Sequence, residues 1–215
     1  MKKPFKTAAW CGIVSLVLSV IIFLAGFTWG DKGRLVGNFF GLISGVLWIF
    51  FTYGFVVLGK RFKNTLLTVM AWIGVVIGII ILTIGFFVTM FSLLGNVSAQ
   101  TEGNLEEFDF STFQGNVNIN SSGSLTEQEI LGLMIILILW IVISLIIGAY
   151  RILFGVGLLK LKDRVQYANT AGILEIVGGA TLIVFVGFIP MIAALIVEII
   201  MLFKASEKFE GRRKI

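Results

Sequence analysis

The chain has 215 residues, of which 58% are hydrophobic and 13% charged, with a mean hydropathy of +1.03 and a formal net charge of +5. Several apolar runs are long enough to cross a bilayer, which excludes a water-soluble globular domain. Histidine is absent and Cys11 is the single cysteine. This excludes histidine-based acid–base catalysis, structural disulfides and the usual zinc sites.

Six apolar segments bounded by charged residues are predicted to be membrane-spanning helices, because a helix satisfies its own backbone hydrogen bonds in lipid. The first has a basic flank but no small-residue cleavage site, so we expect a retained span rather than a signal peptide. The predicted fold class is all-α, a polytopic transmembrane helix bundle of about six spans. In chain order the segments are 7–29, 35–58, 65–94, 130–159, 165–187 and 188–203.

The last apolar stretch, 165–203, is too long for one crossing and short for two. We predict a break between Gly187 and Pro190, because glycine commonly follows a helix end and proline fits the first turn of the next helix. Residues 165–203 therefore form either a hairpin that crosses twice or a re-entrant pair.

The distribution of basic residues predicts orientation. If there are six crossings, 14 of the 17 Lys and Arg residues fall on one side, which the positive-inside rule makes cytoplasmic. Both termini are then cytoplasmic in a multi-pass protein of the cell membrane. This orientation divides the chain into the first three spans (1–94), an acidic external loop (95–129), the last three spans (130–204) and a basic cytoplasmic tail (205–215).

The external loop has no Lys or Arg and six carboxylates, so its net charge is −6. Their spacing does not match a calcium-binding loop, and we expect a solvated surface with no metal site. Two Asn-x-Ser triplets begin at Asn96 and Asn120. They are candidate glycosylation sites, although chance occurrence in a loop rich in Asn and Ser is the stronger explanation.

Two glycine stripes predict that the second and third spans pack closely, because small residues let membrane helices approach each other. A second pattern is internal: residues 42–61 resemble residues 145–164 at an offset of 103. Duplication and chance are equally good explanations of this match. A duplication would make the two helical hairpins a parallel repeat. The stripes consist of Gly37, Gly41 and Gly45, and of Gly74 and Gly78.

Three ionisable residues lie deep inside predicted spans: Arg151, Glu175 and Glu198. Each is costly in lipid and should face inward toward a partner. Arg151 and Glu175 are equally distant from Asp163 in the loop between them, and the next hairpin brings Glu198 to the same depth. Small residues share the helix face of each charge, so we predict that the three meet in the cytoplasmic half of the bundle.

Two carboxyl groups against one guanidinium predict that one carboxyl carries a proton. The cluster is either a structural clamp that sets helix registry or a proton or cation site in a transport pathway. We expect the clamp.

Catalysis is not predicted. Cys11, Ser15 and Ser19 share one helix face, but no base is near them, so helix packing explains them better. No cofactor motif is present. The basic segments are expected to meet anionic lipid rather than nucleic acid, since basic flanks follow from topology.

Three runs in the last quarter of the chain resemble small multi-span prokaryotic membrane proteins of uncharacterised function. They are FGVGLLKLK (154–162), AGILEIVGG (171–179) and VEIIMLFKAS (197–206). The resemblance implies membrane residence and a terminal hairpin, and it carries over no activity. We therefore expect a non-enzymatic scaffold, assembly factor or accessory subunit that contacts lipid, other membrane proteins or further copies of itself. A small transporter or channel is the alternative.

Overall fold

The protein is all-helical in a computed structural model that describes residues 3–28, 30–101, 127–184 and 186–211. No strand occurs in these ranges. The long apolar runs form helices throughout, as expected of chains whose backbone has no water to bond with. The elements are α1 (Lys3–Thr28), α2 (Gly30–Arg61), α3 (Thr65–Thr101), α4 (Glu127–Leu159), α5 (Ala168–Thr181), the 3-10 turn η2 (Leu182–Val184) and α6 (Phe188–Gly211).

Five of the helices are long and apolar enough to span a bilayer: α1, α2, α3, α4 and α6. The chain thus has the helices of a multi-pass membrane protein. The fifth predicted span differs from expectation, because α5 has 14 residues and continues only through η2. A helix of that length is shorter than the roughly 20 residues that a crossing needs.

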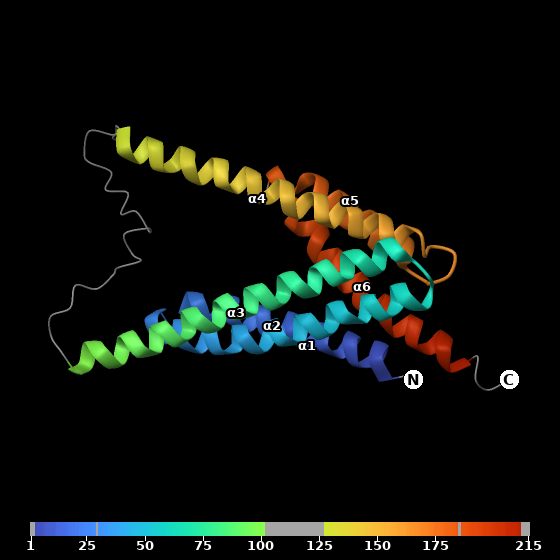
Figure 1. The fold of residues 1–215 in the computed structure, drawn as a ribbon, viewed down its shortest axis with the longest axis horizontal. Helices are drawn as coiled ribbons and strands as arrows, with labels where there is room; N and C mark the ends of the chain where they lie inside the picture. The colour runs from blue at the N-terminus through green and yellow to red at the C-terminus, as the bar shows by residue number, and fades with distance from the viewer. Residues whose placement is uncertain (1–2, 29, 102–126, 185, 212–215) are drawn as a thin grey trace.

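The predicted break in the last apolar stretch is confirmed. α6 begins at Phe188, and Pro190 lies in its first turn, where no intrahelical N–H bond is lost. The amide of Gly187 donates to the carbonyl of Thr181, which closes the end of the preceding helix. The turn lies beside the middle of α4, since the rings of Trp140 and Phe188 are 6.2 Å apart. The α5–α6 hairpin therefore stops well short of the far end of α4 (Figure 1).

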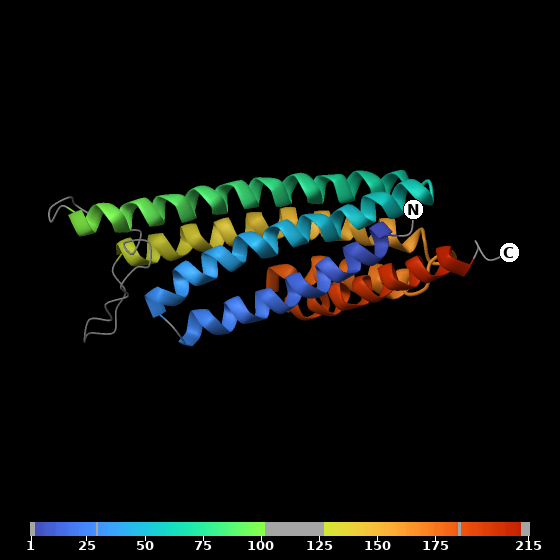
Figure 2. The same ribbon diagram turned by 90° about the horizontal axis from the view of Figure 1, so that it is seen from below.

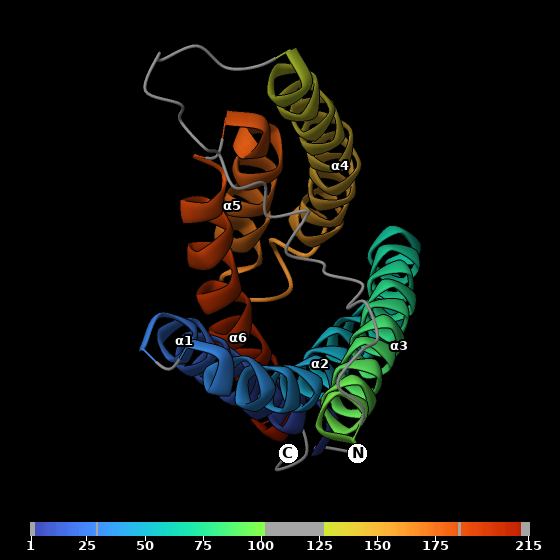
Figure 3. The same ribbon diagram turned by 90° about the vertical axis from the view of Figure 1, so that its left-hand side faces the viewer.

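The helices form two groups. α1, α2 and α3 pack consecutively, as do α4, α5 and α6, and the groups meet where α6 contacts α1 and α3 contacts α4. Seen from below, α1 and α6 run alongside each other (Figure 2). α3 and α4 lie close at the end that carries the α2–α3 and α4–α5 loops, and they diverge toward the other end (Figures 1 and 3). Both described chain ends lie at the loop end.

The core follows this arrangement and lies toward the loop end, where the two groups meet. Aromatic rings join them, with Phe55 and Phe154 5.3 Å apart. The far half of α4 is different: Leu137 and its neighbours are exposed on every face of the helix, at about 60% for Leu137 itself. Between 133 and 143 α4 has no small residue. Such a surface suits acyl chains better than another helix.

The hairpins α2–α3 and α4–α5 place their loops at the same end of the molecule (Figure 1). α3 begins at Thr65 and α5 at Ala168, which is the offset of 103 found in the sequence match. The two hairpins therefore run in the same direction, as a parallel repeat requires. The copies differ in length, because α3 has 37 residues and α5 has 14.

The glycine stripes of α2 and α3 are used only in part. A Cβ on Gly45 would lie 3.1 Å from Leu82, and one on Gly78 would lie 3.0 Å from Ile49, so these two support the predicted α2–α3 contact. A Cβ on Gly41 would have no heavy atom within 4 Å, and a Cβ on Gly37 would face Ile22 of α1 instead of α3. The predicted packing of α2 on α3 is present, and a Cβ on Gly74 would also meet Thr52 of α2 at 3.0 Å, whereas Gly37 and Gly41 do not take part in it.

Candidate functional site

Arg151, Glu175 and Glu198 come together between α4, α5 and α6, and we call them the charge triad. Arg151 Nη1 lies 2.7 Å from Glu175 Oε1 in an ion pair that links α4 to α5. Glu175 is fully buried and Glu198 is 2% exposed. Arg151 lies eight residues before the end of α4, or ~12 Å along the helix axis. The triad thus lies in the half of the bundle nearest the basic loops.

Glu198 of α6 and Glu175 of α5 are both buried where these two helices pack against each other. One oxygen of each, Glu175 Oε2 and Glu198 Oε1, has no donor among the described residues. A single proton shared between these oxygens would form an O–H···O bond and satisfy both. It would also leave one negative charge against the Arg151 guanidinium and make the triad neutral as a whole. Neutrality matters because a net charge in a low-dielectric region is costly.

Close backbone approach between α4 and α5 makes the ion pair possible. A Cβ on Gly148 would lie 2.6 Å from the carbonyl oxygen of Gly179, and one on Gly155 would lie 2.7 Å from that of Gly172. These contacts lie about one turn on either side of Arg151 along α4. Only glycine permits them, and they bring the two helices near enough for the short reach of a glutamate side chain.

The triad also has an aromatic neighbour on α4 that the sequence did not single out. The Tyr150 ring stacks on Phe154 at 6.2 Å. Its hydroxyl lies against Gly74 of α3, so Gly74 serves the contact between the two helix groups rather than the α2–α3 hairpin alone. A Tyr beside a buried Arg was the available signal, because a phenol inside a bundle needs a polar surrounding.

A second missed residue is Asn64, which caps α3. Its Oδ1 accepts from the amide of Leu67 at 3.1 Å, and its Nδ2 donates to the carbonyl of Gly157 on α4 at 2.7 Å. Asparagine directly before an apolar run is a recognised helix-start signal. The sequence carries no signal for the contact with Gly157.

Serine side chains join α1 to α2. The hydroxyls of Ser15 and Ser44 are 2.9 Å apart, and Ser19 donates to the Ser15 carbonyl. Ser15 and Ser19 were expected to serve helix packing, and they do so through a partner that was not foreseen. Cys11 is a free thiol on the same helix.

The remaining predicted site residues lie elsewhere. Asn96 falls within the last turns of α3, and Asn120 and most of the acidic loop lie outside the described residues. Within the described ranges, no three His, Cys, Asp or Glu side chains gather at one point. The triad, with two carboxyls and a guanidinium, is suited to hold a proton rather than a metal ion.

Two surface cavities of the described chain lie at the loop end. One is bounded by the α2–α3 and α4–α5 loops, and the other by the α4–α5 loop and α6. No triad residue lines either of them. The carboxyls are instead enclosed by packed helices.

Comparisons with protein families, with curated proteins and with solved structures found no match for this chain. The resemblance to small multi-span prokaryotic membrane proteins therefore stays a prediction.

We predict that Glu198→Gln folds with nearly wild-type stability, within about 1 kcal/mol, because an amide can donate to Glu175 Oε2 as a protonated carboxyl does. The infrared carbonyl band of a protonated carboxylic acid, present in the wild type at pH 7, should disappear in this variant. Glu207→Gln on the exposed part of α6 serves as the matched control and should leave the band unchanged. Persistence of the band in Glu198→Gln would contradict a proton shared by this pair.

Proposed function

We propose that the protein acts without chemistry of its own, as a membrane scaffold, assembly factor or accessory subunit that works through helix and lipid contacts. The observation that carries this proposal is the enclosure of the charge triad. Its carboxyls are buried, its guanidinium is paired at 2.7 Å, and the two cavities lie elsewhere. Charges arranged in this way tie α4, α5 and α6 into one unit and set their registry.

The proposed location is the cell membrane, with both termini cytoplasmic and residues 95–129 external. Support comes from the shared position of the chain ends and the α2–α3 and α4–α5 loops at one end of the bundle (Figure 1). Those segments carry most of the basic residues, which are retained on the cytoplasmic side.

A small transporter is the second candidate, and the unpartnered oxygens of Glu175 and Glu198 favour it. Carboxyl pairs inside membranes serve as proton relays in pumps and transporters. In that case the shared proton would be exchanged with water on the two sides in turn.

Flux measurements separate the two candidates. Wild type and Glu198→Gln are reconstituted into liposomes that contain a pH-sensitive dye, and a proton or potassium gradient is imposed. The scaffold proposal expects both proteins to match empty liposomes. Flux above that level in the wild type, lost in a folded Glu198→Gln variant, would overturn it in favour of transport.

Crosslinking in native membranes tests the contacts themselves. A photoreactive residue at Leu137, on the all-apolar half of α4, should give lipid adducts. One at Gly41, an exposed position on α2 with no neighbour within 4 Å, should give an adduct of discrete size with a membrane protein or a second copy. Lipid adducts alone at Gly41 would contradict the scaffold proposal.

A further inference from the structure

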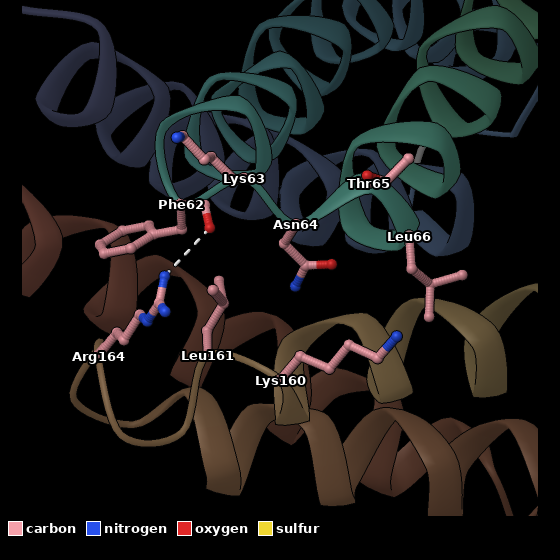
Figure 4. Close-up of a pocket in the computed structure, with 8 residues that line it drawn as sticks. All are labelled: Phe62, Lys63, Asn64, Thr65, Leu66, Lys160, Leu161 and Arg164. Atoms are coloured by element: carbon pink, nitrogen blue, oxygen red, sulfur yellow. Dashed lines mark hydrogen bonds between the residues drawn. The ribbon is translucent and has the colours of Figure 1, made fainter.

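A cavity at the loop end lies between the two helix groups, and its lining is unlike that of the bundle interior. It has a volume of about 330 Å³ and is bounded by the α2–α3 loop on one side and the α4–α5 loop on the other (Figure 4). This is the lower range of volumes found for small-molecule sites. The lining residues are Phe62, Lys63, Asn64, Thr65, Leu66, Lys160, Leu161 and Arg164.

The charge of the lining is positive only. Lys160 and Arg164 extend from the α4–α5 loop toward the α2–α3 loop, whereas the Lys63 amine points away from the facing loop (Figure 4). Arg164 Nη1 donates to the carbonyl of Phe62 at 3.2 Å. The guanidinium has five N–H donors, so most of them stay available. The one acid of the α4–α5 loop, Asp163, is exposed and does not line the cavity.

Backbone donors add to these cations, because α3 begins inside the cavity. Asn64 Oδ1 accepts from the amide of Leu67, and the carbonyl of Asn64 accepts from that of Thr68. The amides of Thr65 and Leu66 in the same first turn have no acceptor within the described chain. A helix N-terminus with free amides beside two cationic side chains favours an anion, and phosphate above all.

Three apolar side chains also line the cavity, at the loop end of the long apolar helices. Leu161 is buried, and Phe62 and Leu66 are half-buried, so apolar side chains from both loops lie beside the charged groups (Figure 4). α3 continues from this point as an apolar span of 27 residues. A soluble anion gains nothing from the apolar side chains. A phospholipid, in contrast, places its phosphate on the charged groups and its acyl chains on the apolar side chains.

We propose that this cavity binds the phosphate headgroup of an anionic phospholipid, held by Lys160, Arg164 and the N-terminus of α3. The site deepens the lipid contacts of the proposed function, on which it rests only for the insertion of the bundle in a membrane. Because its two walls belong to different helix groups, the bound lipid joins those groups at the end where α3 and α4 converge. It adds to the direct links made by Asn64 and Arg164.

The test uses the full chain in detergent, titrated with phosphatidylglycerol or with phosphatidylcholine. Native mass spectrometry counts the bound lipid, and circular dichroism follows the melting of the helices. We expect saturable binding of phosphatidylglycerol, a rise in melting temperature, and neither effect with phosphatidylcholine. The double variant Lys160→Ala/Arg164→Ala should weaken binding at least about tenfold. Lys162→Ala is the matched control from the same loop, and it should change binding by about twofold or less.

Two results would overturn the site. Equal weakening by Lys162→Ala would show that general surface charge, and not this cavity, attracts the lipid. Saturable binding of inorganic phosphate with no preference for phosphatidylglycerol would assign the cavity to a soluble anion. Helical content and melting of each lipid-free variant verify folding. Neither result alters the flux or crosslinking outcomes, so this inference and the proposed function fail separately.

Discussion

The double variant Glu175→Gln/Glu198→Gln is expected to lose about 3–5 kcal/mol of unfolding free energy, the largest effect of any substitution considered. Both replacements keep the shape of the side chain and remove every carboxylate from the triad. The Arg151 guanidinium is then left in the bundle without a counter-charge, which is the costly way to break a buried ion pair. Reversible SDS titration in mixed micelles, followed by tryptophan fluorescence, measures the change.

Adding Arg151→Met to that double variant should restore most of the lost stability. The methionine removes the orphaned charge and fills a similar volume, and apolar replacement of a buried ion pair is often neutral or stabilising. Removing the exposed surface pair between Lys204 and Glu207, by Glu207→Gln, should leave the unfolding midpoint nearly unchanged, because water screens an exposed pair. A double variant as stable as the wild type would show that the triad does not clamp the helices.

Gly148→Ala is expected to cost about 1–3 kcal/mol, because its methyl group would lie 2.6 Å from the carbonyl oxygen of Gly179. A backbone atom cannot rotate away as a flexible side chain can. α4 and α5 must therefore separate, which also lengthens the Arg151–Glu175 contact. Gly155→Ala meets the carbonyl of Gly172 in the same way, and it should behave alike. The SDS titration used for the triad measures both variants.

Gly132→Ala is the matched control for these substitutions. It lies on the same helix, with nothing within 4 Å of the added methyl group, and should change stability by less than about 0.5 kcal/mol. An equal loss at Gly132 would mean that the approach of α5 does not account for the effect at Gly148, because helix propensity by itself favours alanine over glycine.

Much of the triad followed from helical spacing. Equal distances from Asp163 placed Arg151 opposite Glu175, and the structure brings them to 2.7 Å. The break before α6 followed from Gly187 and Pro190 in the same way. Such predictions succeed because rise per residue and hairpin register are local properties of a helix.

The glycine stripes show where such reasoning stops. Gly41 and Gly148 both lie within long apolar helices, yet a Cβ on the first would have nothing within 4 Å and a Cβ on the second would meet a backbone carbonyl. The difference depends on which helix lies opposite and how near, and local spacing does not contain that information. The cavity at Lys160 and Arg164 is another case, because its two walls lie about 100 residues apart in the chain.

By itself the sequence determined the membrane class, the approximate spans and the pairing of Arg151 with Glu175, since each depends on composition or on helical periodicity. The orientation stays a prediction. Only the tertiary structure decided that α5 is too short to span, that α3 and α4 diverge away from the loops, and which glycines carry close contacts. It also placed Asn64 and Arg164 across the junction of the two groups. These features arise from the packing of distant segments, whose mutual distances no single segment encodes.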